Sequence, residues 1–392
     1  MKTFESSRAM ERLPSQFFAK LVKKVNEVKR HSDDVINLGQ GNPDQPTPAH
    51  IVEKLKEAAD NPMHHKYAPF AGHTFLKEAV AEYYHREYGV EIDAQTEVAV
   101  LGGAKTGLIE LSQCLLDPED LALVPDPGYP DYWSGVELAG AKMHMMPLLQ
   151  ELDFHPDFTT LKEETLEQAK LMFLNYPNNP TGAIATPALF QDAIELGQKH
   201  DLCIVHDFAY GAIGFEGKKP LSFLQLKGAK DVGVEVMTLS KTYNMAGWRV
   251  GFVVGNKSVV SAIEKLQDHL FCSIFGGIQE AAAHALLSEQ QCVEDLVATY
   301  EARRNVLVEA AHKAGWEAEA PLGSFFAWFP VPKDYTSEEF ADILLKEARV
   351  VVAPGVGFGK YGEGYVRIGL LADEDTLREA MERIGALRLF DK

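Results

Sequence analysis

The sequence predicts an α/β fold, with a large domain built on a mostly parallel sheet flanked by helices, and a smaller α+β domain. Short apolar runs alternate with longer amphipathic stretches over most of the chain, and this pattern changes toward the C-terminus. Strands without polar alternation are covered on both faces, and strand–helix–strand order is typical of a parallel sheet. A length of 392 residues also suggests about two domains.

The large domain is expected at residues 46–290. Apolar runs that we expect to be strands of its sheet lie at 96–101, 121–125, 171–175, 202–207, 234–240 and 251–256. The apolar spacing of 186–200 is typical of an amphipathic helix between two of these strands.

The C-terminal small domain is expected at residues 291–392, where helical and strand-like runs follow each other without strict alternation. We expect a helix at 303–315, strands at 325–331, 348–355 and 364–371, and a closing amphipathic helix at 373–390. Residues 1–45 are expected to be an arm with one helix that forms part of the small domain.

Composition argues against several classes of function. The formal net charge of −19 disfavours a nucleic-acid partner, because a phosphate backbone would be repelled. The four cysteines are scattered and no HExxH is present, so neither a disulfide framework nor a metal site is expected. No apolar stretch approaches the ~20 residues of a membrane span, and the first residues lack the apolar core of an export signal. We therefore expect a cytoplasmic protein without a membrane partner.

Polar side chains stand at the ends of the predicted strands, where ligands collect in parallel α/β sheets. Lys241 follows one apolar strand, Asp207 ends another, and Arg367 lies within a third. Each also has an ordinary structural explanation: a solvated turn lysine, an aspartate that caps the next helix, and an arginine paired with a structural carboxylate.

Three loops after the strands add further candidates. "GGAKTGL" (102–108) opens a helix, where glycine lets the backbone approach a ligand and helix N–H groups attract phosphate. "DPGYPDY" (126–132) is a rigid turn that could hold Tyr129 over the sheet edge. "NYPNNPTG" (175–182) is a stiff loop that could aim Asn179 at a ligand oxygen. Turn chemistry alone would also account for each loop.

Together these residues match the needs of one cofactor. Pyridoxal 5'-phosphate requires a lysine for a Schiff base, an acid opposite its ring nitrogen, a stacked aromatic ring and donors for its phosphate. The motifs "NYPNNPTG", "HDFAY" and "SKTYNMAGWRVGF", in this order, resemble those of fold-type I pyridoxal-phosphate-dependent aminotransferases of the aspartate aminotransferase class. The resemblance covers nearly the whole chain. It looks closest to the methionine-salvage aminotransferases, and "DPGYP" and "SKTYNM" are also similar to the LL-diaminopimelate branch.

The resemblance implies an aminotransferase that moves an amino group between an amino acid and a 2-oxo acid by ping-pong chemistry. It implies that Lys241 forms the Schiff base and moves the proton, that Asp207 pairs with the pyridine nitrogen, and that Tyr210 and Asn179 hold the ring 3-oxygen. The implied cofactor-binding residues are Ala104, Lys105, Tyr129, Asn179, Asp207, Tyr210, Thr238, Ser240, Lys241, Arg249 and, from the neighbouring subunit of a homodimer, Tyr67. The implied substrate-binding residues are Gly41, Asn179 and Arg367, and no metal is implied.

The substrate is predicted from a missing charge. Relatives that act on acidic side chains often use a second arginine from the loop after the lysine strand, but residues 266–302 contain neither arginine nor lysine. Instead this stretch has Phe271, Ile274 and Phe275, which would suit the thioether of methionine or would equally form a dimer core. We therefore expect amination of 4-methylthio-2-oxobutanoate to methionine.

Alternatives to this substrate are aspartate, aromatic amino acids or LL-diaminopimelate, and a second chemistry on the same cofactor would be a carbon–sulfur lyase. Gln16 stands where a tyrosine is expected in the diaminopimelate branch, which counts against that alternative.

Overall fold

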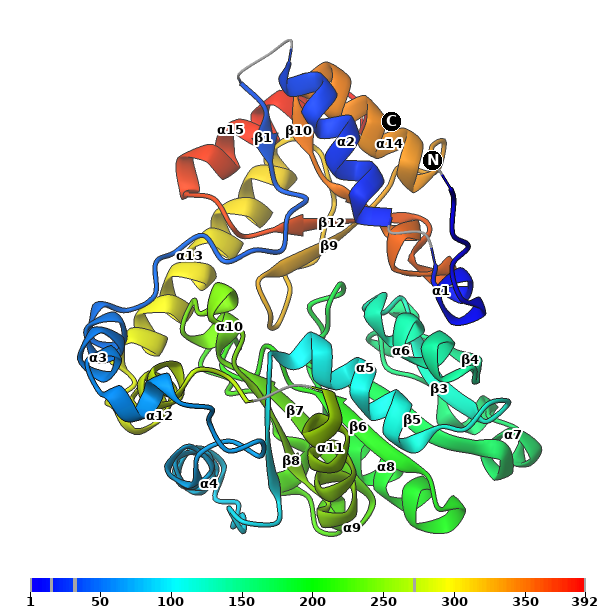
Figure 1. Ribbon diagram of the computed structural model, residues 1–392. Coiled ribbons are helices and arrows are strands. Elements are labelled where there is room, and N and C mark those ends of the chain that lie inside the picture. Colours follow the sequence, from blue (N-terminus) through cyan, green and yellow to red (C-terminus); the bar gives the residue numbers. More distant parts are fainter. Residues whose placement is uncertain (1, 15–16, 31–33, 271–272, 391–392) are drawn as a thin grey trace.

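A computed structural model of the chain describes residues 2–14, 17–30, 34–270 and 273–390. It has two regions of sheet, a large one in the lower part of Figure 1 and a smaller one in the upper part. Within these ranges, no helix is both long enough and apolar enough to cross a membrane.

The large sheet has seven strands, of which one is antiparallel to its neighbours. Their order across the sheet is β2 (Val98–Leu101), β8 (Gly251–Gly255), β7 (Gly233–Thr238), β6 (Cys203–Asp207), β5 (Ala169–Asn175), β3 (Leu121–Asp126) and β4 (Lys142–Pro147). Strand β8 runs antiparallel to β2 and β7, whereas the other neighbouring pairs are parallel. The predicted mostly parallel sheet is confirmed, and six of its strands lie where apolar runs predicted them.

Strand β4 is the element of this sheet that the apolar pattern did not predict. Its sequence, KMHMMP, contains no β-branched residue, and most of its side chains are only half-buried. It lies at the edge of the sheet and pairs with β3 alone. An edge strand has little need of the continuous apolar run that marks the central strands.

Helices cover both faces of the large sheet, as the strand pattern predicted. One face packs on α5 (Ala104–Leu115), α6 (Asp131–Ala139) and α11 (Lys257–Leu270). The other packs on α4 (Thr74–Tyr88), α8 (Pro187–His200) and α12 (Gly276–Leu287). Successive residues of one strand alternate between these two cores: in β5, Leu171 and Phe173 belong to the first and Met172 and Leu174 to the second. This alternation is the ordinary geometry of a β-strand.

The smaller region combines residues from both ends of the chain. Its antiparallel sheet has the order β11 (Ala353–Pro354), β12 (Tyr365–Gly369) and β9 (Phe326–Pro330). The helices packed around it include α13 (Gln291–Lys313), α14 (Ser337–Ile343) and α15 (Glu374–Gly385). The N-terminal helix α2 (Phe17–Lys29) lies beside them in Figure 1.

The N-terminal segment is tied to the C-terminal region through a second small sheet. Strand β1 (Ile36–Asn37) pairs in parallel with β10 (Val350–Val351). Val25 of α2 packs with Leu345 and Val351 in a small apolar cluster. The arm is therefore joined to the C-terminal region, whereas the domain limits at residues 45 and 290 stay a prediction.

Candidate active site

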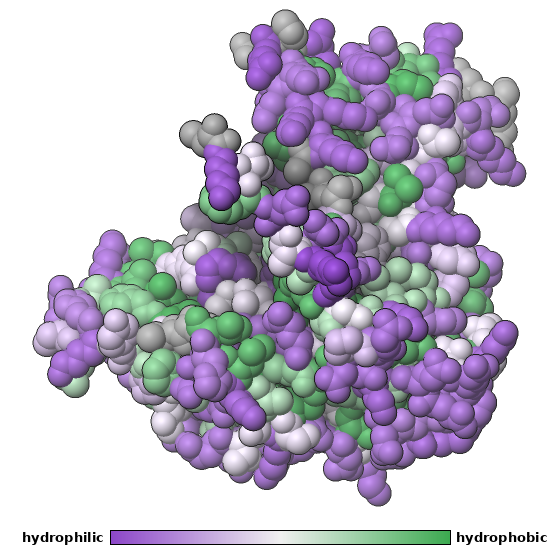
Figure 2. Space-filling view, turned by 45° about the vertical axis from the view of Figure 1, so that its right-hand side comes forward, coloured by the Kyte–Doolittle hydropathy of each residue, from purple (hydrophilic) through white to green (hydrophobic). Residues whose placement is uncertain are grey.

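A cavity of about 530 Å³ lies between the two sheets, at the carboxyl ends of the parallel strands. Figure 2 shows a recess between the upper and lower parts of the molecule. Twelve of the residues that the sequence singled out line this one cavity: Gly41, Ala104, Lys105, Tyr129, Asn179, Asp207, Tyr210, Thr238, Ser240, Lys241, Arg249 and Arg367. Tyr67 does not line it and is 88% exposed.

The order of the strands explains why distant residues meet. Strands β5, β6 and β7 are parallel neighbours, and the last residues of two of them, Asn175 and Asp207, are register partners. Lys241 follows β7 by one turn, in the short helix α10 (Leu239–Thr242) that Thr238 caps. Polar side chains at three adjacent strand ends therefore face the same space.

Lys241 is half-buried and its amine is held beside the backbone. Its Nζ donates to the carbonyl oxygen of Gly41 at 3.0 Å. Burial and, after it, the nearby positive charges of Arg367 and Arg249 lower the pKa of Lys241 to about 8, against an opposing effect of Asp207. This amine can therefore give up its proton close to neutral pH, unlike a solvated turn lysine.

Asp207 is buried and points its carboxylate into the site. Its Oδ2 accepts from the hydroxyl of Tyr132 at 2.7 Å and its Oδ1 from the backbone N–H of Ala209 at 3.2 Å. Burial raises the pKa of Asp207, while the Tyr132 hydrogen bond and the charges of His206 and Lys241 oppose that rise. The residues that follow form turns, so Asp207 does not cap a helix.

Arg367 is buried in the middle of β12 with its guanidinium fixed on several sides. Nη1 donates to Asn179 Oδ1 at 2.9 Å and Nη2 to the carbonyl of Gly39 at 3.1 Å. The group also lies 3.9 Å from the centre of the Phe326 ring and 4.7 Å from that of Phe358. Burial lowers the pKa of Arg367 to about 10, so it stays charged at neutral pH. An anion is the natural ligand of such a group.

Asn179 is positioned by its own loop. Its backbone N–H donates to Asn175 Oδ1 at 2.8 Å, and Asn175 Nδ2 donates to the carbonyl of Asp207 at 2.8 Å. The loop that carries the amide is thus bonded to the strand that carries the carboxylate. This arrangement links Arg367, Asn179 and Asp207 through consecutive hydrogen bonds.

The opposite end of the cavity gathers groups suited to a phosphate ester. Helix α5 begins at Ala104, directly after Gly103, whose φ of +97° favours glycine. A Cβ on Gly103 would overlap the guanidinium of Arg249, so the glycine allows this close approach. The hydroxyl of Ser240 lies 2.9 Å from that of Thr238. Helix N–H groups, hydroxyls and a guanidinium together form a donor set that fits phosphate.

Two predicted residues at this end have contacts that the sequence did not indicate. The Thr238 hydroxyl lies 3.0 Å from the Val250 carbonyl oxygen and accepts from the Ser240 N–H, so it is already engaged in capping α10. The side chain of Lys105 turns to Asp131, with its Nζ 2.9 Å from Oδ1. The part of Lys105 that the site can use is its backbone N–H, as predicted from the resemblance.

Tyrosines form one wall of the cavity. Tyr129 lies edge-on to Tyr132 with the ring centres 5.8 Å apart, and Tyr210 lies edge-on to Phe325 at 5.2 Å. Burial raises the pKa of both Tyr129 and Tyr210, so their hydroxyls keep their protons at neutral pH. Both can therefore donate hydrogen bonds to an acceptor in the cavity.

Sequence reasoning missed three contributions to the site. Tyr132, which donates to Asp207, and Asn175, which orders the loop, both lie inside motifs that had drawn attention for other residues. The third is α2, which supplies Leu21, Val22 and Val25 to the cavity wall. Its amphipathic pattern predicted a helix, but the pattern could not identify what the apolar face would line.

Two of the apolar side chains that were expected either to face the substrate or to form a dimer core, Ile274 and Phe275, do not line the cavity of the single chain. Ile274 packs against the core of the large region, and Phe275 is 39% exposed and stacks on His65 at 6.4 Å between ring centres. Neither lines the cavity, whose apolar wall comes from α2 instead. Phe271 and Gln16 lie outside the described residues. A role of Phe275 in an interface between subunits stays a prediction.

Comparisons with known proteins identify the family of the chain. Residues 33–384 match the family model "Aminotransferase class I and II". The chain is 61% identical to the L-glutamine--4-(methylsulfanyl)-2-oxobutanoate aminotransferase of Bacillus subtilis, over 99% of this chain and 97% of that relative. It is 42% identical to the LL-diaminopimelate aminotransferase of Moorella thermoacetica, over 97% of each chain. The solved apo structure of BacF from Bacillus subtilis superposes with a TM-score of 0.95 at 48% identity, covering 98% of both chains. The chain therefore belongs to the class I and II aminotransferases.

Proposed function

We propose that this aminotransferase uses pyridoxal 5'-phosphate and converts 4-(methylsulfanyl)-2-oxobutanoate to methionine. The observation that carries the cofactor assignment is the convergence of Lys241, Asp207 and Arg367 on one cavity whose far end offers phosphate donors. When bound, the cofactor supplies an aldehyde that takes up an amino group and a cationic ring that withdraws electrons from the bond being broken.

The residues that would hold the cofactor all line the cavity. The N–H groups of Ala104 and Lys105, the hydroxyl of Ser240 and the guanidinium of Arg249 would hold its phosphate, with Thr238 orienting Ser240. Tyr129 would stack on its ring and Asp207 would face the ring nitrogen, while Tyr210 and Asn179 would hold the 3-oxygen.

Lys241 moves the proton in this proposal. Its amine would hold the cofactor through the aldehyde. With a pKa of about 8, Nζ would also be able to accept the proton of the substrate α-carbon when it is not holding the cofactor. The carbonyl of Gly41, 3.0 Å away, holds the amine at the mouth of the substrate site.

Arg367 orients the substrate. Its two Nη atoms are fixed by Asn179 and Gly39, so the guanidinium can clamp the α-carboxylate without losing much side-chain freedom. Lys241 and Arg367 both lie next to Gly41, so a carboxylate held by Arg367 would keep the substrate α-carbon near Nζ of Lys241.

The substrate side chain is expected to lie against α2. Leu21, Val22 and Val25, together with Phe326 and Val351, give the cavity apolar side chains that suit a thioether. Asn26 and Lys29 of the same helix also line the cavity. The relative that shares 61% identity is named for the same 2-oxo acid and for glutamine as the amino donor. We propose the same 2-oxo acid and the same amino donor for this chain.

A homodimer is part of the proposal. Tyr67 is 88% exposed in the single chain, which is consistent with its predicted reach into the cofactor site of a neighbouring subunit. The cytoplasmic location likewise stays a prediction from the sequence.

A panel of 2-oxo acids tests the substrate. With glutamine as donor, we expect 4-(methylsulfanyl)-2-oxobutanoate to give the highest kcat/KM, ahead of oxaloacetate, 2-oxoglutarate and phenylpyruvate. LL-diaminopimelate as donor would test the alternative that relatives at 42% identity suggest. Higher kcat/KM for a dicarboxylate would contradict the apolar wall. Incubation with methionine alone distinguishes a carbon–sulfur lyase from an aminotransferase. Only the lyase would release ammonia when no 2-oxo acid acceptor is present.

A further inference from the structure

Directly behind Asp207, on the opposite face of β6, lies an ion pair that is entirely buried. His206 Nδ1 is 2.8 Å from Glu235 Oε2, and both side chains are 0% exposed. Strand alternation points Asp207 into the cavity and His206 into the core under α8. Glu235 is the register partner of His206 on β7, so the two side chains lie on the same face.

The contacts of Glu235 are those of an ionised carboxylate. Its carboxylate accepts from the Tyr84 hydroxyl at 2.8 Å, the Ser222 hydroxyl at 2.9 Å and the Phe223 N–H at 2.8 Å. Burial raises the pKa of Tyr84 well above its usual range, so this hydroxyl keeps the proton that it donates in this geometry. An ionised carboxylate has about four lone-pair sites. These three donors leave the fourth site for His206.

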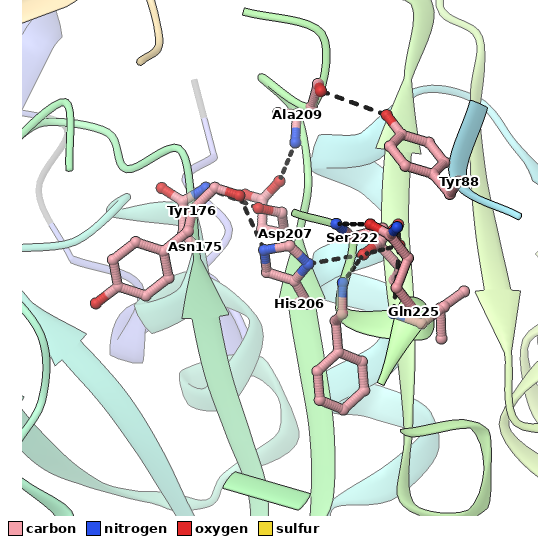
Figure 3. Close-up of polar contacts among 12 residues, drawn as sticks. Tyr88, Asn175, Tyr176, His206, Asp207, Ala209, Ser222 and Gln225 are labelled. Carbon is pink, nitrogen blue, oxygen red and sulfur yellow. Dashed lines mark hydrogen bonds and ion pairs between the residues drawn. The ribbon is translucent and has the colours of Figure 1, made fainter. Parts of the chain in front are cut away.

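The other ring nitrogen of His206 is equally constrained. Nε2 lies 2.9 Å from the carbonyl oxygen of Tyr176, which can only accept, so Nε2 carries a proton. Nδ1 faces the remaining site of an ionised carboxylate and carries a proton as well. Figure 3 shows the imidazole below Asp207, with dashed lines leaving both of its nitrogens. This hydrogen-bond pattern fits a charged imidazolium beside an ionised carboxylate.

We propose that His206 is a positioning residue whose fixed positive charge holds Asp207 ionised beneath the cofactor ring. The inference rests on the proposed role of Asp207 opposite the ring nitrogen. The charge is needed because burial raises the pKa of Asp207 and favours its neutral form, which cannot pair with a cationic ring. His206 is bonded to Asp207 through the chain, and Glu235 lies beyond it on β7, so the positive end of the pair is the nearer one.

The same residue anchors the loop that carries Asn179. Its bond to the Tyr176 carbonyl is made at the start of "NYPNNPTG", and Asn175 of this loop donates to the Asp207 carbonyl. One side chain thus ties the strand end of Asp207 to the loop that supports Arg367.

The surroundings leave few other groups that could produce a pH effect. The titratable and charged groups around Asp207 and the His206–Glu235 pair come from four further elements and the neighbouring loops. They are Lys241 on α10, Tyr132 on α6, Tyr83, Tyr84 and Tyr88 on α4, Glu235 on β7, and the loop residues Tyr129 and Tyr210. Burial raises the pKa of each of these tyrosines, so none of them titrates near neutrality.

The charge of His206 can be read in the cofactor-free protein, independently of any activity. In ¹⁵N-histidine NMR spectra at about pH 8, where an ordinary imidazole is neutral, one of the thirteen histidines should show two protonated ring nitrogens, and this signal should vanish in His206→Gln. A His206 signal with one unprotonated nitrogen at about pH 7 would overturn the proposal.

A pH profile tests the effect on Asp207. In His206→Gln the pKa of Asp207 should rise further, so the acid limb of kcat/KM should move to higher pH by about one unit. Glu235→Gln, which removes the counter-ion that keeps His206 charged, should move the limb in the same direction. Tyr84→Phe removes one hydrogen bond to Glu235 without changing a charge, and should leave the limb in place. An equal loss of activity at all pH values in His206→Gln would show a merely structural role and refute the proposal.

A double variant covers the case in which a single variant does not fold. Replacing both partners, in His206→Gln with Glu235→Gln, leaves a neutral pair of similar volume and no unpaired buried charge. It should fold, and its acid limb should still move to higher pH. An unmoved limb in this folded variant would overturn the proposal. Absence of transamination in the wild type would instead refute the proposed function, while the NMR result would still decide the state of His206.

Discussion

At the scale of single residues, Lys241 differs from an ordinary surface lysine in both its burial and its neighbours. Its amine is bonded to Gly41, and two arginines raise the cost of its positive charge. An unperturbed lysine has a pKa of about 10.4, whereas burial lowers that of Lys241 to about 8. The lowered pKa gives the residue a neutral amine at a pH where other lysines are charged.

The first prediction concerns the pH dependence of cofactor attachment. Only the neutral amine of Lys241 attacks an aldehyde, so the attachment rate of the cofactor-free protein should rise with pH up to about 8 and then level off. Stopped-flow absorbance with pyridoxal phosphate measures this rate, and a lysine-containing peptide is the control. A rate that keeps rising to about pH 10 would mean that Lys241 is not perturbed.

The second prediction concerns the carboxylate and its missed partner. Asp207→Asn removes the charge opposite the ring nitrogen and should lower kcat by at least about 10²-fold. Tyr132→Phe removes only the 2.7 Å hydrogen bond to Asp207 and should cost about tenfold. Steady-state kinetics measures kcat for both variants, and an unchanged far-ultraviolet circular dichroism spectrum shows that each is folded. Wild-type kcat in Asp207→Asn would be incompatible with the assigned role.

At the scale of elements, the sequence predicts the central strands well and the cavity wall poorly. Strands β5, β6 and β7 are buried on both faces, and such strands need continuous apolar runs that the sequence displays. Edge strand β4 is less buried and carries no such run. Helix α2 shows an apolar face, but that face meets the cavity and the β10 region, hundreds of residues away in the sequence.

The residues of the site were likewise predictable where the order of the strands brings them together, and not where long-range packing does. The motif residues Asp207, Asn179 and Lys241 follow strands directly, so the topology of a parallel sheet was sufficient to bring them together. Arg367 lies on a strand of a different sheet. Its position inside an apolar strand marked it as a candidate, but only the family resemblance indicated that it binds the substrate. The bond from Tyr132 to Asp207 depends on the side-chain geometry of α6, which no periodicity encodes.

The third prediction tests α2 as the wall of the substrate site. Val22 lines the cavity and is 57% exposed, so Val22→Asp should change specificity with little effect on folding. A carboxylate beside the thioether should lower kcat/KM for 4-(methylsulfanyl)-2-oxobutanoate by at least about tenfold. Lys23→Asp, also exposed on α2 but outside the cavity lining, is the matched control. Equal effects of the two variants would exclude Val22 from the substrate wall.

At the scale of the whole molecule, large hydrophobic side chains are exposed around the segment that contains Tyr67. They include Met63, Tyr67, Phe70, Phe75 and Phe275, each at least 36% exposed. Exposed apolar side chains that gather in this way are typical of surfaces that a partner covers. This distribution supports the proposed homodimer and the predicted reach of Tyr67 into a second cavity.

The fourth prediction separates assembly from cofactor binding. Light scattering should give the mass of two chains, and Tyr67→Phe should leave that mass unchanged while weakening retention of pyridoxal phosphate about tenfold. Tyr361→Phe, a tyrosine that is 40% exposed and does not line the cavity, is the control. A monomeric wild type, or full cofactor retention in Tyr67→Phe, would contradict a site shared between subunits.

The central claim is that the amine of Lys241 carries the cofactor, and it can be measured directly. Purified protein loaded with pyridoxal phosphate should absorb near ~400–430 nm, and borohydride reduction followed by peptide mass mapping should find the added mass on Lys241. The band and the modification should be absent in Lys241→Ala and present in Lys105→Ala, whose side chain pairs with Asp131. Reduced cofactor on any other lysine, or an unchanged band in Lys241→Ala, would contradict the account.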